Sequence, residues 1–323
     1  MHSVDFLQEK VRIAIQNHNF MSEPLELYEP ISYTLADGGK RLRPVITLMA
    51  CDLFGGDIED AISLAIGFEV FHNFTLIHDD IMDLAPIRRN KETVYKKWNT
   101  NIAILSGDTM FAMGYDFVSN TKIEYLKKVL KIFNQTAIEV CEGQQYDLNY
   151  ETSEDIAIPD YIEMIRLKTA ALIAACMKAG AVVAGASDED CDKIYEFGIN
   201  IGLAFQLKDD LLDVFGDETV FGKKTGGDII TNKKTYLYIK AFEVADEETR
   251  IKLNNLFQLI HQDEEKINQV KKIYSKLQIN KIVDQEIDIY YQKALVNLSE
   301  INIEEERKSE IKTFAENLMK RDY

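Results

Sequence analysis

Apolar residues recur along this chain in helical blocks, and none of its segments shows the sustained alternation of β-branched and polar residues that marks a half-buried strand. Turn-forming clusters separate the blocks at residues 36–39, 53–57, 83–90, 151–160, 187–190 and 215–231. After about Asp246 the chain becomes charge-rich with heptad-like apolar spacing, which predicts helices that pack around the outside and carry no chemistry. The pattern predicts an all-α protein. We expect a single domain over residues 1–323, because no segment reads as an interdomain linker.

Two of the apolar blocks run directly into aspartate-rich pentapeptides. Residues 71–78 lead into Asp79-Asp80-Ile81-Met82-Asp83, and residues 199–208 lead into Asp209-Asp210-Leu211-Leu212-Asp213, 130 residues further on. Four residues turn an α-helix by about 400°, so the first and last aspartate of each motif share a face. A single acidic motif of this kind is often a solvated helix face, but two motifs with apolar flanks are not expected by chance.

Facing carboxylates are hard to hold together without cations between them. Two like charges about 4 Å apart repel by roughly 4 kcal/mol at an effective dielectric constant near 20. Carboxylate oxygens favour Mg²⁺. The two motifs therefore predict a metal–diphosphate site.

Basic residues form a second pattern. The segment Gly38-Gly39-Lys40-Arg41-Leu42-Arg43-Pro44 combines two glycines with three cations near an expected helix start, which suits a phosphate. Arg88 and Arg89 follow the first aspartate motif, and the basic segment 222–228 follows the second. One anionic substrate held through metal and another held by cations alone would use both patterns.

The composition limits the partners and the compartment. A formal charge of -17 disfavours nucleic acid and anionic membranes as partners. The four cysteines are widely spaced, so neither a zinc site nor a disulfide framework is expected. The N-terminal residues lack a signal-peptide pattern, and the longest apolar stretch, residues 169–186, is interrupted by Lys178, so we expect no membrane span and a cytoplasmic protein.

Taken together, the motifs closely resemble those of the trans-isoprenyl diphosphate synthases, the polyprenyl synthetase family, over about residues 30–235. The resemblance implies a helical isoprenoid-synthase bundle around a central active-site cavity. It implies an allylic diphosphate and isopentenyl diphosphate as substrates, three Mg²⁺ ions per active site and a homodimer. Ionisation of the allylic diphosphate, assisted by the metal, gives a carbocation; the isopentenyl double bond attacks it, and the departing diphosphate removes the proton.

The resemblance also assigns residues. Asp79, Asp83 and Asp209 would bind the Mg²⁺ ions. Asp80, Asp210 and Asp213 would support them, either as further ligands or through the ligands. Arg88 and Lys223 would hold the allylic diphosphate directly, with Lys233 near it, and Lys40, Arg43, His72 and Arg89 would hold isopentenyl diphosphate. Oxygen atoms of Lys168, Thr169 and Gln206 would lie near the cation, and Gln144 and Asp147 belong to a segment that lines the pocket.

Bulky residues upstream of the first motif set the product length in this family. Phe74 lies five residues and Phe71 eight residues before Asp79, with the small Thr75 beside Phe74. This arrangement resembles synthases that make the twenty-carbon geranylgeranyl product, with the fifteen-carbon farnesyl product as the alternative. Phe71 lies closer than Phe74 to the angular position of Asp79 on the helix, so Phe71 is also a candidate floor.

Three other functions are open at this point. A terpene cyclase carries a first aspartate motif, but its second metal motif usually contains Asn, Ser or Thr and Glu. A non-catalytic subunit of a heteromeric synthase normally has degraded motifs, whereas both are complete here. A plain helical scaffold would not explain why each motif is followed by basic residues. The sequence leaves the preferred primer and the downstream pathway open, as well as the role of the C-terminal Lys320-Arg321 pair.

Overall fold

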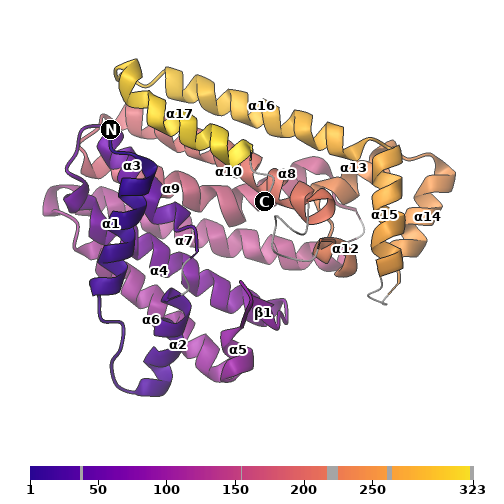
Figure 1. Ribbon diagram of the computed structural model, residues 1–323, viewed down its shortest axis with the longest axis horizontal. Coiled ribbons are helices and arrows are strands. Elements are labelled where there is room, and N and C mark those ends of the chain that lie inside the picture. The colour runs from indigo at the N-terminus through magenta and orange to yellow at the C-terminus, as the bar shows by residue number, and fades with distance from the viewer. Residues whose placement is uncertain (37–38, 154, 217–224, 260–263, 321–323) are drawn as a thin grey trace. The chain divides into compact units, whose positions relative to one another are not determined.

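The computed structural model describes residues 1–36, 39–153, 155–216, 225–259 and 264–320. These residues are predominantly helical, so the all-α prediction is confirmed. One small departure is a two-stranded hairpin inside the expected turn 83–90 and just after it. The elements (Figure 1) are α1 Val4–Asn17, α2 Leu25–Leu35, α3 Leu42–Leu53, α4 Ile58–Met82, β1 Ile87–Arg88, β2 Lys91–Glu92, α5 Val94–Lys97, α6 Thr100–Ser119, α7 Ile123–Thr152, α8 Ile158–Ile165, the π-helical segment η1 Arg166–Ala170, α9 Ala171–Val183, α10 Asp188–Phe215, α12 Gly227–Ile230, α13 Tyr236–Val244, α14 Glu247–Phe257, α15 Glu264–Lys276, α16 Ile279–Ser299 and α17 Glu305–Met319.

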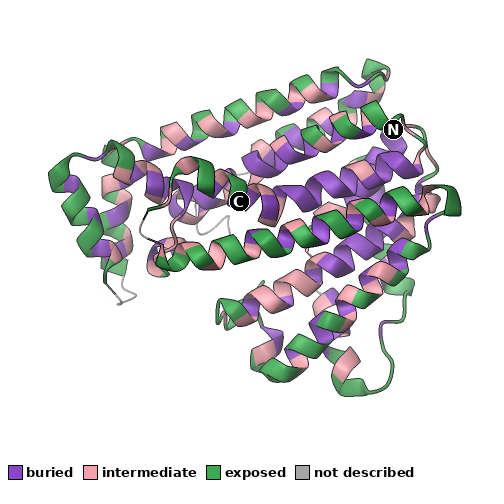
Figure 2. Cartoon of the chain, turned by 180° about the vertical axis from the view of Figure 1, so that it is seen from behind, coloured by how far each residue is buried: buried purple, intermediate pink, exposed green. Residues whose placement is uncertain are grey.

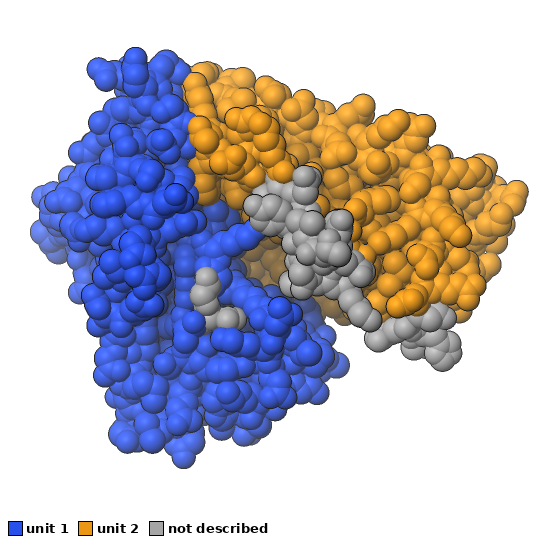
Figure 3. Space-filling model, in the orientation of Figure 1, with its two compact units in different colours: residues 1–134, 175–194, 302–310 blue, residues 135–174, 195–301, 311–323 orange. Residues whose placement is uncertain are grey.

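The chain divides into two compact units (Figure 3). Unit 1 contains residues 1–134, 175–194 and 302–310, and unit 2 contains residues 135–174, 195–301 and 311–323. The helices α7, α9, α10 and α17 contribute residues to both units. The first aspartate motif belongs to unit 1 and the second to unit 2. The expectation of a single domain stays a prediction.

The helix α4 is the centre of unit 1. It begins at the N-cap Asp57, whose side chain accepts a hydrogen bond from the backbone N–H of Glu59 at 3.0 Å. Both α3 and α6 pack against it. Among the described helices, α4 alone has the length and hydropathy that a membrane span requires, and 61% of its most apolar stretch is buried inside the protein, as in a core helix.

Glycines allow α4 and α6 to approach closely, and the two helices run antiparallel. A Cβ atom added to Gly67 would lie 2.8 Å from Val118 Cγ2 and 3.0 Å from the Gly114 carbonyl oxygen. Nearer the other end of α4, a Cβ atom on Gly107 would lie 2.3 Å from His78 Nε2. The end of α4 that carries the aspartates is therefore fixed tightly against the beginning of α6.

In unit 2 one apolar core joins the segments that carry the second motif to the charge-rich C-terminal helices. Five of the heptad positions are buried, Leu253 and Leu256 in α14 and Ile287, Ala294 and Leu298 in α16. Ile267 of α15 and Tyr291 of α16 are half-buried. Figure 2 shows the alternation of buried and exposed residues along these helices. Ile260, another of the heptad positions, lies outside the described residues.

A second pair of glycines brings α10 onto η1 and the start of α9. A Cβ atom on Gly202 would lie 2.6 Å from Ala170 Cα, and one on Gly198 would lie 2.5 Å from Ala174 Cα. The small residues Ala170 and Ala174 thus serve close helix packing within unit 2. This contact places Gln206 of α10 beside Thr169 of η1.

Replacement of Gly67 by alanine tests the packing of α4 on α6. We expect the free energy of unfolding to fall by about 1–3 kcal/mol, because the new methyl group meets a backbone carbonyl and a buried valine. Gly114→Ala is the matched control on the facing helix, where a Cβ atom meets nothing closer than 3.4 Å. That variant should be neutral or more stable by up to about 1 kcal/mol. Equal effects of the two substitutions in denaturant titrations would contradict this account.

Candidate active site

The first aspartate motif occupies the end of α4. Asp79 and Asp80 lie in the last turn, and Asp83 is the C-cap residue. Here the helix dipole is negative, so three carboxylates at this position repel both one another and the helix end. Asp80 is buried, with 5% of its surface exposed, whereas Asp79 is half-buried and Asp83 is exposed.

Arg88 compensates part of this negative charge. Its Nε donates to Asp80 Oδ1 at 2.7 Å, and its Nη2 donates to Asp79 Oδ2 at 3.0 Å. Burial raises the pKa of Asp80 above its usual range, and the charge and hydrogen bond of Arg88 oppose that shift. Arg88 therefore lies at the first motif, where the family resemblance places a diphosphate ligand.

The hairpin β1–β2 delivers Arg88 to this position. Its strands pair Ile87 with Glu92 and Arg88 with Lys91. The two turn residues, Arg89 and Asn90, have φ values of 51° and 62°, which is the left-handed pairing that a two-residue hairpin loop requires. Asparagine adopts this conformation readily, but arginine does so at some cost, so the turn is a strained position beside the aspartates.

The basic residues predicted to bind without metal gather in unit 1. The guanidinium of Arg89 lies against Gly39, because a Cβ atom at Gly39 would be 2.5 Å from Arg89 Nη1. Burial, followed by the charges of Arg43 and Arg89, lowers the pKa of His72 well below its usual range. His72 is therefore neutral near pH 7 and surrounded by cations, an arrangement suited to an anion. Lys40 is exposed next to Gly39, and Gly38 lies outside the described residues.

The aromatic residues upstream of the first motif form a continuous cluster in unit 1. Phe71 is buried, with 1% exposed, and its ring contacts Phe74 at 5.5 Å and Phe111 of α6 at 5.7 Å between centroids. Phe74 contacts Phe111 at 5.2 Å. Thr75 donates to the His72 carbonyl at 2.7 Å and is thereby tied to its own helix. Phe111 had no signal in the sequence, since only its position on the neighbouring helix brings it to the two phenylalanines.

His78 packs against this cluster. Its ring stacks edge-on to Phe74 at 4.8 Å, and its Nε2 lies 3.2 Å from the Ile104 carbonyl oxygen. His78 is thus held by contacts with Phe74 of its own helix and with the Ile104 carbonyl of α6.

The second aspartate motif occupies the last two turns of α10 in unit 2. Asp210 is buried, with 4% exposed, and both of its oxygens accept hydrogen bonds. Tyr161 of α8 donates its hydroxyl to Oδ2, and Gln206 Nε2 donates to Oδ1 at 3.0 Å. Burial, and then the nearby charge of Asp228, raise the pKa of Asp210 to about 8.

The other two aspartates of this motif are half-buried. Asp213 Oδ2 accepts from the backbone N–H of Asp228 at 3.0 Å, and the Asp213 carbonyl accepts from the N–H of Gly226 at 2.6 Å. These bonds hold Gly226 and Asp228 against the end of α10. Lys223, predicted to bind the diphosphate, lies outside the described residues.

Three further predicted residues meet around the π-helical segment η1. Lys168 Nζ donates to Asp147 Oδ2 at 2.5 Å, and Lys233 Nζ lies 3.5 Å from the same oxygen. Burial opposes ionisation of Asp147, but Lys233 and Lys168 lower the pKa of its carboxyl below its usual range. Asp147 therefore remains a carboxylate and positions two lysines.

The neighbouring residues complete this group. Thr169 donates its hydroxyl to Gln206 Oε1 at 3.0 Å, so Thr169, Gln206 and Asp210 form one hydrogen-bonded chain. Gly143 lets α7 approach η1, since a Cβ atom there would lie 2.3 Å from the Lys168 backbone nitrogen. Beside it, Gln144 has a buried Nε2 without a hydrogen-bond partner in the structure.

Comparison with known proteins identifies this arrangement. Residues 24–277 match the sequence profile of the family described as Polyprenyl synthetase. The chain belongs to the polyprenyl synthetase family.

Several relatives of this polyprenyl synthetase have established names. A geranylgeranyl diphosphate synthase from Methanosarcina mazei is 40% identical over 225 residues, which are 69% of each chain. A geranylfarnesyl diphosphate synthase from Natronomonas pharaonis is 35% identical over 252 residues, 72% of this chain and 74% of the other. A crystal structure of a geranylgeranyl pyrophosphate synthase matches with a TM-score of 0.95 and 43% identity, covering 99% of both chains. This polyprenyl synthetase is a short-chain prenyltransferase and not a cyclase.

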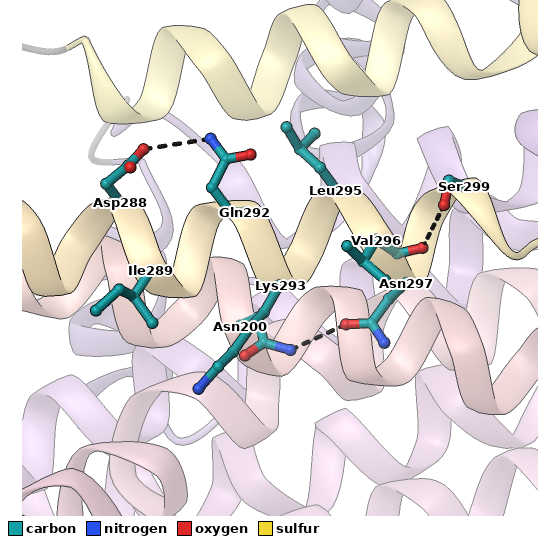
Figure 4. A pocket seen from close by; sticks show the side chains of 9 residues that line it. All are labelled: Asn200, Asp288, Ile289, Gln292, Lys293, Leu295, Val296, Asn297 and Ser299. Atoms are coloured by element: carbon teal, nitrogen blue, oxygen red, sulfur yellow. Dashed lines mark hydrogen bonds between the residues drawn. The ribbon is translucent and has the colours of Figure 1, made fainter.

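A surface hollow in unit 2 of the synthase has no part in this site (Figure 4). It lies along α16 and is lined by Asn200, Asp288, Ile289, Gln292, Lys293, Leu295, Val296, Asn297 and Ser299. Its polar groups bond to one another, as in the bonds from Asn200 to Asn297 at 3.0 Å and from Gln292 to Asp288 at 3.3 Å. Asn200 also lies about 13 Å along α10 from Asp209.

Sequence reasoning missed two buried residues of the synthase whose partners lie on other segments of the chain. Tyr161 precedes Lys168 by seven residues in an ordinary amphipathic helix, and nothing in that pattern predicts its bond to Asp210. Glu69 precedes Asp79 by ten residues and reads as one polar residue in an apolar helix; its partner is Arg41. A charged residue in the middle of an apolar run was the available signal for Glu69.

Removal of the Tyr161 hydroxyl tests its support of the second motif. We expect Tyr161→Phe to lower the free energy of unfolding by about 1–3 kcal/mol, because a buried carboxyl oxygen loses its donor. Tyr150→Phe is the control, since the Tyr150 hydroxyl reaches only the Asp160 carbonyl at 3.5 Å. The control should change stability by less than about 0.5 kcal/mol. Similar losses from both substitutions would mean that the bond to Asp210 contributes nothing particular.

Proposed function

We propose that this synthase condenses isopentenyl diphosphate with an allylic diphosphate, head to tail and in trans, and releases geranylgeranyl diphosphate. The observation that carries the proposal is the presence of two different kinds of anion site among the described residues. The carboxylates at the ends of α4 and α10 need cations, whereas the group of Lys40, Arg43, His72 and Arg89 already carries positive charge. Two diphosphates bound in two ways account for both.

Mg²⁺ fits the first kind of site. The available donors are the oxygens of the partly exposed carboxylates Asp79, Asp83, Asp209 and Asp213, and hard oxygen donors suit this ion. Three or more acidic, histidine or cysteine side chains do not converge into a metal site anywhere in the described part of the chain. Mg²⁺ is commonly held by one or two carboxylates together with substrate phosphates, so we propose that three ions bind with the allylic diphosphate. When bound, they would stabilise the negative charge that develops on the leaving diphosphate.

The middle aspartates have a different role in this proposal. Asp80 is held by Arg88, and Asp210 by Tyr161 and Gln206, so each is turned toward protein donors. They would orient the ends of their helices and support the neighbouring carboxylates that bind metal.

The remaining residues bind the substrates and shield the reacting carbons. Arg88, Lys223 and Lys233 would hold the allylic diphosphate, and Lys40, Arg43, His72 and Arg89 would hold isopentenyl diphosphate. A hydrogen bond joins Thr169 to Gln206 and restricts the motion of both side chains. Their oxygens would therefore be held in place to face a developing carbocation. The Lys168 carbonyl would act with them, while its ammonium stays on Asp147. Gln144 would line the pocket nearby.

We further propose a single cytoplasmic domain that functions as a homodimer. The apolar side chains Ile104 and Leu105 on α6 are 40% and 58% exposed and would be covered by a second copy. Sedimentation that shows only monomer at micromolar concentration would refute the dimer.

Incubation of the purified chain with Mg²⁺, labelled isopentenyl diphosphate and each allylic primer in turn tests the reaction. We expect a twenty-carbon diphosphate as the main product and no turnover after chelation of the metal. A fifteen-carbon or twenty-five-carbon diphosphate would change the proposed product length and leave the proposed reaction in place. A hydrocarbon product would contradict prenyl transfer, and no turnover with any primer would favour a non-catalytic subunit.

Replacement of Phe71 and Phe74 by alanine tests the floor of the product channel. We expect at least one of the two variants to lengthen the main product by one or more five-carbon units, because removal of a ring opens space in the cluster with Phe111. Phe197→Leu, at a fully buried aromatic of unit 2, is the control for general loosening and should leave the product unchanged. An unchanged product from both alanine variants, resolved by chain length, would sink the floor hypothesis.

A further inference from the structure

A buried ion pair in unit 1 connects α4 to the start of α3. Arg41 Nη1 donates to Glu69 Oε1 at 2.7 Å, and the side chains are 12% and 4% exposed. Glu69 Oε1 also accepts from Asn73 Nδ2 at 3.1 Å. Glu69, His72 and Asn73 lie three and four residues apart, so they share one face of α4.

Arg41 is itself held in an unusual conformation. It is the N-cap of α3 with a left-handed φ of 46°, and its side chain makes no capping bond. Its Nη2 donates instead to the carbonyl of Leu35, the last residue of α2. One guanidinium therefore ties together the end of α2, the start of α3 and the middle of α4.

Stability alone does not explain this arrangement. A buried ion pair loses the hydration of both charges, and replacement by apolar residues is often neutral or stabilising. A left-handed arginine adds a further cost. A pair of this kind is better suited to fix one geometry than to hold the fold together.

The segment that this pair fixes is the basic one. Lys40 and Arg43 lie on either side of Arg41 in the sequence, and the Arg89 guanidinium lies against the neighbouring Gly39. Bonds from Arg41 to two neighbouring helices restrict the backbone of the residues beside it, because each fixed residue loses conformational freedom.

We propose that Glu69 is a positioning residue that, through Arg41, holds Lys40 and Arg43 where isopentenyl diphosphate binds. In this role neither Glu69 nor Arg41 would touch the substrate. This inference rests on the proposed function, because it assigns the ligand of the basic group from the reaction.

Glu69→Gln in the full-length protein tests the inference, since glutamine keeps the shape and an acceptor oxygen but removes the charge. We expect the KM for isopentenyl diphosphate to rise about tenfold or more, because small displacements of binding groups are costly. The kcat and the KM for the allylic primer should stay within about twofold. Glu59→Gln, on the same helix, is the matched control; Glu59 pairs with Lys10 at the surface with 56% of its side chain exposed. The control should leave all three parameters unchanged.

Calorimetry adds a readout that does not depend on turnover. Isopentenyl diphosphate is titrated into each protein without Mg²⁺, and its Kd should rise by the same factor as the KM. In Arg41→Gln the Kd should also rise, and the double variant should bind no more weakly than the weaker single variant, because both residues act as one unit. Unfolding temperatures separate this effect from loss of the fold.

The outcomes divide clearly. Parallel increases in both KM values, or a lower kcat with an unchanged KM for isopentenyl diphosphate, would overturn the positioning role. If the parent protein binds isopentenyl diphosphate without metal but catalyses no reaction, the proposed function fails. A higher Kd for Glu69→Gln than for the parent protein would then still support the inference. If the parent protein does not bind isopentenyl diphosphate in the absence of metal, the inference is wrong. Should Glu69→Gln prove unfolded, the Kd of Arg41→Lys decides, with an unchanged value counting against the proposal.

Discussion

Negative charge at the carboxyl ends of two helices is the constraint on which the rest of this structure depends. The end of an α-helix already carries a partial negative charge, and each aspartate there adds to it. Three aspartates sit at the end of α4 and three in the last turns of α10. The surrounding elements supply what these helix ends lack, which is hydrogen-bond donors and positive charge.

The two motifs are stabilised in the same way, by donors to the middle aspartate, but the donor residues differ. In each, the middle aspartate is buried and receives its donors from elsewhere in its own unit, Arg88 of the hairpin in one case and Tyr161 with Gln206 in the other. The flanking aspartates remain partly accessible. Each motif thus combines one buried aspartate with two more accessible ones. The donor to the buried aspartate is an arginine in the first motif, and the donors are uncharged side chains in the second.

Much of this was readable from the sequence, because helical spacing determines which residues share a face. The helices, the placement of both motifs at helix ends and the burial of five of the heptad positions follow from periodicity. Spacing along one helix does not reveal what another helix brings to it. The contacts of Phe111, Tyr161 and Glu69 therefore had to come from the structure, and so did the hairpin, whose left-handed Arg89-Asn90 turn lies within a segment that predicted only a turn.

The π-helical segment η1 limits how the length of the chain can vary at this point of the site. A turn that is wider than an α-turn holds one residue more than regular winding requires, and such insertions often mark functional positions. It contributes a displaced main chain, which every amino acid except proline can supply. Substitutions at Lys168 or Thr169 would leave that contribution intact. Deletion of a single residue between Arg166 and Ala170 would restore regular α-helical winding and remove the displacement of the main chain. This part of the site therefore depends on the number of residues in the segment rather than on their identities.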